Sequence, residues 1–307
     1  MRLCALSVDL DEVPCYHAIH GLPPASGPAA HAVYADAVPR FRALFKELGV
    51  PGTFFVIGQD LEDDLVRERL RGLLDDGHEL SNHSLSHRYD LTRLPPGAQR
   101  DEVQGGIAAM ERALGVRPVG FRAPGYTLTD GLLAALRDLK VSYDSSVFPC
   151  PAYWGAKAGA IGWIALRGRE SRSVVDNPSV LLAPADPYRA GTPYWKPGPE
   201  GPLEFPIGVT RGVRLPYIGT SVMLAGRRGA PLLTAQMDGR PLVNLELHGM
   251  DLLEAADGLG YLERHQPDLR VPLATKEAIL RGVVTDLRRR GYGFVTLARA
   301  AEVWATR

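Results

Sequence analysis

Hydrophobic and polar positions along this chain follow two patterns, one typical of strands and one typical of helices, and the two patterns alternate. Short apolar runs bounded by Gly, Asp or Asn indicate buried strands, whereas longer runs with apolar residues three or four apart indicate helices. The predicted strands cover residues 3–10, 52–58, 78–82, 119–123, 141–144, 242–247 and 294–297. The predicted helices cover residues 35–48, 61–74, 96–114, 129–139 and 276–290. This alternation predicts an α/β fold with a parallel sheet or a barrel.

Several predicted helices have recognisable ends. Gly49 and Gly115 each follow the last apolar position of a helix, where glycine favours termination. Thr129 opens the helix over 129–139 as its capping residue, and Asp130 lies in the first turn of that helix. These signals predict where the chain turns back toward the next strand.

Residues 149–241 are rich in Gly and Pro and show weak periodicity. A region this long inside a compact domain usually decorates an active site, so it is predicted to be a loop-rich insertion. The shorter Pro-rich run at 21–28 is predicted to be a loop over the same edge of the sheet. No internal repeat and no linker divides the chain, so residues 1–307 are expected to form a single catalytic domain.

Polar side chains stand at the carboxyl ends of the predicted strands, where α/β barrels carry their active sites. They are Asp9, Asp11, His83, Arg122, Asp144 and His248. Because alternate residues of a strand share a face, Asp9 and Asp11 are expected to point into one site.

His83 and His87 are four residues apart, and together with a carboxylate they would form a facial set for a divalent metal. The remaining carboxylate of the Asp9–Asp11 pair could act as a base, and His248 could act as an acid. The structural alternatives are that the aspartates cap the next helix and that His248 is a core histidine. The aromatic residues Tyr126, Trp154, Tyr194, Trp195 and Tyr217 could line a substrate cleft or belong to the core.

Composition excludes several other classes of protein. Thirty-five basic residues balance thirty-five acidic ones, so no field of one sign is available for nucleic acid or an anionic membrane. Three widely spaced cysteines argue against a disulfide scaffold. The sequence shows no long apolar signal region near its start and no apolar stretch that could span a bilayer, so a cytoplasmic location is expected.

Five segments in a fixed order resemble the polysaccharide deacetylases, the carbohydrate-esterase group that shares the rhizobial chitooligosaccharide deacetylase domain. The segments are Ser7-Val-Asp-Leu-Asp11, His83-Ser-Leu-Ser-His87, Arg122-Ala-Pro-Gly-Tyr126, Tyr143-Asp-Ser-Ser146 and Leu245-Glu-Leu-His248. Further similar stretches lie at 52–58, 77–82 and 293–297, so the resemblance spans residues 3–297.

The resemblance implies a distorted (β/α)7 barrel and metal-assisted amide hydrolysis. It implies that Asp11, His83 and His87 hold the metal, usually zinc, with Co²⁺, Ni²⁺ or Mn²⁺ as alternatives. It also implies that Asp9 is the base and that His248 is the acid that protonates the leaving amine. Arg122 would orient the base, and the backbone N–H of Gly125 would donate to the oxyanion.

Three departures from the family pattern affect these expectations. The first motif usually has adjacent aspartates, whereas Leu10 separates them here. Gly125 intervenes before the aromatic Tyr126 in the third motif, which bears on the oxyanion donor and on sugar stacking. The usual Asp-Trp pair of the fourth motif is missing, and Asp144 is the candidate replacement as orienting partner of His248 or as a substrate contact.

The expected function is removal of an N-acyl group, most directly N-acetyl, from a soluble or lipid-linked glycan that contains an amino sugar. The alternatives are a deformylase of a lipid-linked formamido sugar, a hydrolase of a non-sugar amide or cyclic imide, and an inactive barrel that binds glycans. The sequence leaves the sugar, the acyl group, the metal and the oligomeric state open.

Overall fold

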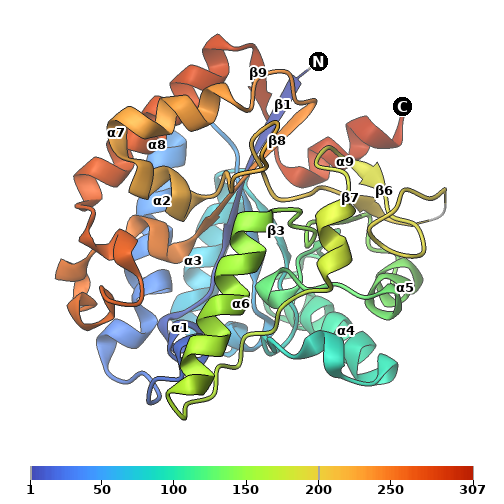
Figure 1. Ribbon diagram of the computed structural model, residues 1–307, viewed down its shortest axis with the longest axis horizontal. Helices are drawn as coiled ribbons and strands as arrows, with labels where there is room; N and C mark the ends of the chain where they lie inside the picture. Colours follow the sequence, from blue (N-terminus) through green and yellow to red (C-terminus); the bar gives the residue numbers. More distant parts are fainter. Residues whose placement is uncertain (1, 200, 307) are drawn as a thin grey trace.

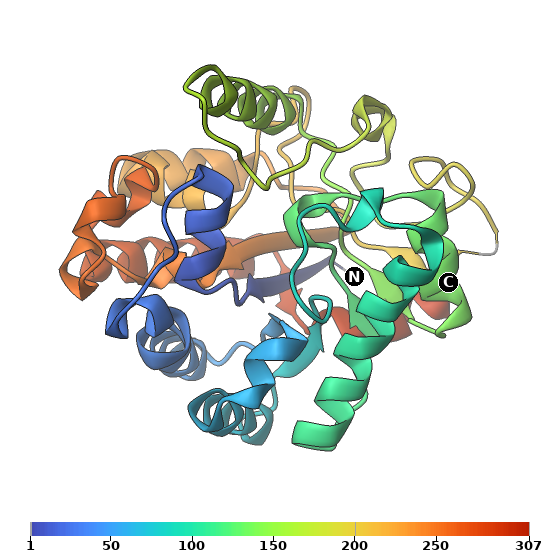
Figure 2. The same cartoon turned by 90° about the horizontal axis from the view of Figure 1, so that it is seen from below.

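The fold is a curled sheet surrounded by helices, as a computed structural model that describes residues 2–199 and 201–306 shows (Figure 1; Figure 2). The strands are β1 (Arg2–Asp9), β2 (Thr53–Val56), β3 (Glu79–Asn82), β4 (Gly120–Phe121), β5 (Tyr143–Asp144), β6 (Tyr188–Arg189), β7 (Leu203–Glu204), β8 (Leu242–His248) and β9 (Tyr292–Phe294). The helices are α1 (Val13–His20), α2 (Val38–Leu48), α3 (Asp64–Asp75), α4 (Pro96–Leu114), α5 (Asp130–Asp138), α6 (Pro151–Leu166), α7 (Gly219–Ala235), α8 (Leu273–Arg289) and α9 (Leu297–Ala305).

The sheet follows the order of a distorted barrel. Parallel pairing runs β7-β5-β4-β3-β2-β1-β8, with β6 antiparallel on β7 and β9 beside β1. Between β7 and β8 the barrel is bridged by the chain that follows β7. There Gly208 N donates to Asn244 O (2.9 Å), and Asn244 Nδ2 donates to Phe205 O (3.1 Å). The predicted α/β barrel is therefore confirmed as a curled sheet whose last junction is made by loop and side-chain contacts.

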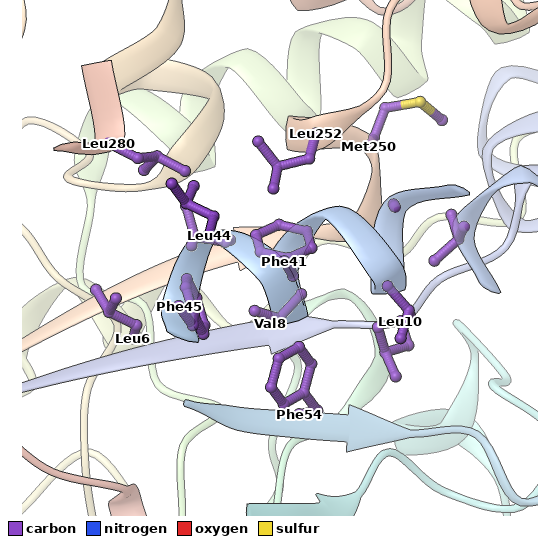
Figure 3. Close-up of a cluster of buried hydrophobic side chains, with 14 of the residues drawn as sticks. Leu6, Val8, Leu10, Phe41, Leu44, Phe45, Phe54, Met250, Leu252 and Leu280 are labelled. Carbon is purple, nitrogen blue, oxygen red and sulfur yellow. The ribbon is translucent and has the colours of Figure 1, made fainter. Parts of the chain in front are cut away.

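Strand β1 separates the core from the barrel interior. Its residues Leu6 and Val8, with Leu10 just beyond, point outward beneath Phe41 and Phe45 of α2 (Figure 3). The alternate residues of β1 point inward, because successive side chains of a strand face opposite sides. This inward set begins with the apolar Leu3 and Ala5 and continues with the polar Ser7 and Asp9. The alternation places carboxylates inside the barrel while the outer face supplies the apolar core.

The predicted helix ends are largely confirmed. Helices α2 and α4 end at Gly49 and Gly115, which adopt the left-handed conformation (φ of 59° and 72°) that glycine tolerates best. Thr129 caps α5 by accepting a hydrogen bond from Leu132 N (3.1 Å). The last strand was predicted too late in the chain, because β9 covers Tyr292–Phe294 and shares only Phe294 with the predicted range 294–297. Leu297 already begins α9.

The segment at 149–241 is more regular than predicted. It contains α6 and α7, and β7 extends the sheet by pairing with β5. Helix α6 lies in front of the sheet in Figure 1 and stands clear of the strands, at the top of the view, in Figure 2. The organisation of residues 1–307 as a single domain stays a prediction. Within the described part of the chain, no helix combines the length and the hydropathy needed to cross a bilayer.

Candidate metal centre and active site

Asp9 and Asp11 stand where β1 leaves the sheet. Asp9 is the last residue of the strand and lies in register with His248 of β8. Asp11, two residues further on, stays on the same side and is 6% exposed. The spaced Asp9-Leu10-Asp11 motif therefore directs both carboxylates into one site, as the period of a strand predicts.

A tight loop after β3, rather than a helix, sets the spacing between His83 and His87. Ser84 and His87 have positive φ values of 69° and 52°, and Ser84 Oγ accepts from His87 N (3.0 Å). Ser86 is held by Glu102 of α4, which accepts from both its N (3.0 Å) and its Oγ (2.6 Å). These contacts turn the loop so that both imidazoles face Asp11.

Three donor atoms meet at this point. Asp11 Oδ1 lies 3.2 Å from His83 Nε2 and 3.1 Å from His87 Nε2, and the two Nε2 atoms are 3.2 Å apart. His83 Nδ1 donates to the carbonyl oxygen of Arg122 (2.7 Å), which fixes the ring so that Nε2 faces Asp11. Burial alone would raise the pKa of Asp11, but the adjacent His87 and His83 hold it well below its usual range. The carboxyl group is therefore ionised.

This donor set fits a divalent cation. Ligands about 2.0–2.2 Å from one ion, at tetrahedral or octahedral angles, lie about 2.8–3.6 Å apart, and all three separations fall in that range. Asp9 Oδ2 and Asp11 Oδ1 are buried and accept no hydrogen bond from any residue that the structure describes. Two imidazole nitrogens and a carboxylate are the donors that zinc and related metals prefer. The role of Asp11, His83 and His87 as ligands remains a prediction that this geometry supports.

Asp9 is fixed by a fully buried arginine. Arg122 Nη1 donates to Asp9 Oδ1 (2.6 Å), and the guanidinium stacks 4.1 Å from the centre of the Phe55 ring. Its other nitrogens donate to Ser7 Oγ (2.9 Å) and to Ser145 O and Oγ (2.9 and 2.8 Å). With Oδ1 occupied, Oδ2 is the free oxygen of Asp9, and it lies 3.9 Å from His83 Nε2.

His248 ends β8 with both ring nitrogens engaged. Its Nδ1 lies 2.9 Å from Glu246 Oε1, and its Nε2 lies 2.9 Å from the Tyr126 hydroxyl. Its backbone N donates to Asp251 Oδ2 (2.8 Å). Burial alone would lower the pKa of His248, but the Glu246 carboxylate raises it well above its usual value. The imidazole is therefore protonated at neutral pH, as a general acid must be.

Glu246 is the functional neighbour that the sequence interpretation missed, although it lies within a quoted motif. Residues two apart in a strand share a face, so Glu246 and His248 are placed together by β8 itself. The prediction that Asp144 orients His248 is wrong. Asp144 Oδ1 instead accepts from Ser146 Oγ (2.7 Å), and Ser146 Oγ accepts from Ala123 N (2.8 Å), so Asp144 supports the loop before Gly125.

A cavity of about 380 Å³ opens onto these groups. Gly125 and Tyr126 lie on its wall, as predicted, and both adopt positive φ values (65° and 56°). Tyr16, Tyr89, Tyr153 and Lys157, which carry no motif signal, also line it. Of the other suggested cleft aromatics, Tyr217 belongs to the main core, and three pack in or against a second apolar cluster: Trp154, Tyr194 and Trp195.

Comparisons with known proteins agree with this fold. Residues 27–143 match the polysaccharide deacetylase family model, which leaves the segments around Asp9, Asp11 and His248 outside the matched range. A crystal structure of a Mycobacterium smegmatis protein classed with the polysaccharide deacetylases superimposes with a TM-score of 0.61. The two sequences are 21% identical, and the superposition covers 98% of this chain and 90% of that one. At this identity the similarity is one of fold.

Two curated relatives are similar over shorter stretches. The peptidoglycan deacetylase-like protein FGM2 of Gibberella zeae is 33% identical over 95 residues, 31% of this chain and 27% of that protein. The peptidoglycan deacetylase of Helicobacter pylori is 25% identical over 147 residues, 47% of this chain and 49% of that protein. The chain thus spans less than half the length of either relative. These comparisons show a similarity to polysaccharide deacetylases over residues 27–143 and a likeness of fold over the rest of the chain.

Proposed function

We propose that this protein is a metal-dependent hydrolase that removes an N-acyl group, most directly N-acetyl, from a substrate containing an amino sugar. One observation carries the proposal. Asp11 and His83, two corners of the donor triangle that His87 completes, line the same cavity as Asp9, a carboxylate with a free buried oxygen, and His248, a protonated imidazole. A metal set, a base and an acid are the three parts that hydrolysis of an unactivated amide needs.

The proposed base is Asp9. When bound, a divalent cation at Asp11, His83 and His87 would polarise the acyl carbonyl and lower the pKa of water toward about 7. Oδ2 of Asp9 accepts the proton that the attacking water loses, because Oδ1 is held by Arg122 at 2.6 Å. The guanidinium fixes the orientation of this carboxylate, and the free oxygen lies 3.9 Å from His83 Nε2 of the donor triangle.

The proposed acid is His248. An amine leaves a tetrahedral carbon poorly unless its nitrogen is protonated, so a donor must stand opposite the base. Glu246 holds His248 in its charged form through Nδ1, which leaves the proton on Nε2 facing the cavity beside the Tyr126 hydroxyl. The leaving nitrogen would receive its proton from Nε2.

Gly125 and Tyr126 are proposed to contact the reacting group. The Gly125 N–H is the candidate donor to the oxyanion, and the positive φ values of both residues turn this segment toward the cavity. The Tyr89 and Tyr153 rings give the cavity flat apolar surfaces on which a sugar ring can pack.

The related reactions differ in the acyl group or its carrier. Deformylation of a lipid-linked formamido sugar, or hydrolysis of a non-sugar amide or cyclic imide, would use the same metal set, base and acid. An inactive glycan-binding barrel is disfavoured because the candidate base and acid are both present and held in position.

The test is a release assay on metal-loaded protein. Purified protein is assayed for bound metal, then incubated with N-acetylated and N-formylated amino sugars and oligosaccharides, a simple N-acetyl amine and a cyclic imide. Metal-dependent release of acetate from the amino sugars is expected. Release from the imide alone, or no release from any compound by the metal-loaded protein, would overturn the proposal.

A further inference from the structure

Lys157 places a positive charge inside the cavity for which the proposed reaction has no use. It is the one charged residue among the sixteen of α6, whose remaining side chains are apolar apart from the Tyr and Trp polar atoms. A charged side chain on a surface helix ordinarily points to solvent. Lys157 instead points inward, where it lines the cavity together with Asp9 and His248.

The hydrogen bonding of this ammonium group is incomplete. Nζ donates to the carbonyl oxygen of Gly125 (2.6 Å), and among the described residues it has no ion-pair partner. The nearby Asp176 carboxylate accepts from the Tyr194 hydroxyl (2.9 Å) and from Asn177 N (2.7 Å). Burial lowers the pKa of Lys157 to about 8, which leaves it charged at neutral pH. An ammonium removed from water favours an anionic partner, and the cavity is where one can reach it.

Positive charge continues beyond the catalytic cavity. A second cavity of about 680 Å³ shares Tyr89 and Ser173 with the first and also reaches His87. Its wall carries Arg88, Arg93 and Arg172, against one acidic residue among its described lining, Asp90. Asp90 is engaged with Arg88 through two hydrogen bonds (2.9 and 2.8 Å), so Arg93 and Arg172 remain without an ion pair in the described part of the chain.

We propose that the substrate carries a carboxylate or a phosphate close to the N-acylated sugar, and that Lys157 binds this group. Arg93 and Arg172 receive further anionic groups along an extended substrate that passes Tyr89. This inference rests on the proposed function and narrows its substrate class to acidic amino-sugar glycans. The whole chain has no net charge, so the excess of basic over acidic side chains around the second cavity is a local property.

The first test compares matched substrates. The kcat/KM values are measured for a neutral N-acetylglucosamine oligomer, for one carrying lactyl carboxylates and for one carrying phosphate esters. The wild type is expected to prefer one of the two acidic oligomers over the neutral one. The preferred oligomer then shows whether Lys157 binds a carboxylate or a phosphate. Lys157→Met should lower the acidic-to-neutral ratio about tenfold or more, whereas Lys157→Arg should keep most of it. Lys196→Met is the control, because Lys196 is an exposed lysine of the same 149–241 segment. An equal ratio in the wild type and in Lys157→Met overturns the inference.

The second test needs no turnover. Calorimetry measures binding of muramic acid, glucosamine 6-phosphate and glucosamine to the wild type and to Lys157→Met. Tighter binding of an acidic sugar that is lost in Lys157→Met supports the inference even if no acyl group is released. Acetate release that is equal from neutral and acidic sugars, with equal binding, would overturn the inference and leave the proposed function standing.

Discussion

The fully buried Glu246 and the partly exposed His248 form a carboxylate–imidazole pair, 2.9 Å apart, from two positions of one strand. The pairing needs no contact between distant segments, because β8 itself directs both side chains into the barrel. The carboxylate keeps the ring protonated, and the ring in turn meets Tyr126 across the cavity.

The pH profile should depend on this pair. A general acid works only while protonated, so activity is lost as pH rises through the raised pKa of His248. In Glu246→Gln the carboxylate charge is gone, and the alkaline limb of kcat/KM should move down by about one pH unit or more. Glu263→Gln, far from the site, should leave the limb in place. An unchanged limb in Glu246→Gln would contradict the role given to the pair.

Metal binding should depend on His83. The His83→Ala variant removes one corner of the donor triangle and should lower the metal-to-protein ratio, measured by mass spectrometry after desalting, about tenfold or more. The exposed His31 is the control, and His31→Ala should keep the wild-type ratio. Full metal content in His83→Ala would remove His83 from the ligand set.

Loss of the proton-accepting group of Asp9 should leave metal binding intact. The Asp9→Asn variant keeps an oxygen that can accept from Arg122 but cannot take up a proton at neutral pH. Metal content should stay near the wild-type value, while kcat falls by about 10²–10⁴-fold. If Asp9→Asn hydrolyses at near the wild-type rate, another group is the base.

Glu204 should make stability depend on pH. Burial and the neighbouring Asp144 carboxylate raise the pKa of Glu204 well above its usual value, so the folded protein retains a proton that the unfolded chain releases. The stability from this proton is complete below the unfolded pKa and is lost as pH rises through the folded one. The Tm of Glu204→Gln, relative to the wild type, should therefore be about 2–4 °C higher at pH 8 than at pH 5. A Tm difference that does not vary with pH would contradict this account.

The convergence of Asp9, Asp11 and His83 could be predicted from the sequence, because local rules govern it. The period of a strand places Asp9 and Asp11 on one face, and the parallel order of β1, β2 and β3 brings His83 beside them. The ends of α4 and α5 followed from a glycine and a threonine with well-defined conformational preferences.

The opposite wall was predicted poorly, for physical reasons. Helix α6 lacks the polar face that gives a surface helix its 3.6-residue signal, so its sequence showed weak periodicity. The sequence pattern therefore gave no indication that Lys157 lines a cavity. Asp144 was assigned to His248 by motif position, whereas the nearer Glu246 was available through the geometry of β8 alone.

The residues of the cavity divide along the chain. Those that would hold the ion lie between residues 11 and 87, whereas much of the facing wall lies between Gly125 and Ser221. The facing wall joins β8 through side-chain and loop contacts such as the one between Asn244 and Phe205. Insertions or replacements there can reshape one wall of the cavity without displacing the residues that would hold the ion, so the ligand preference and the ion site can change independently.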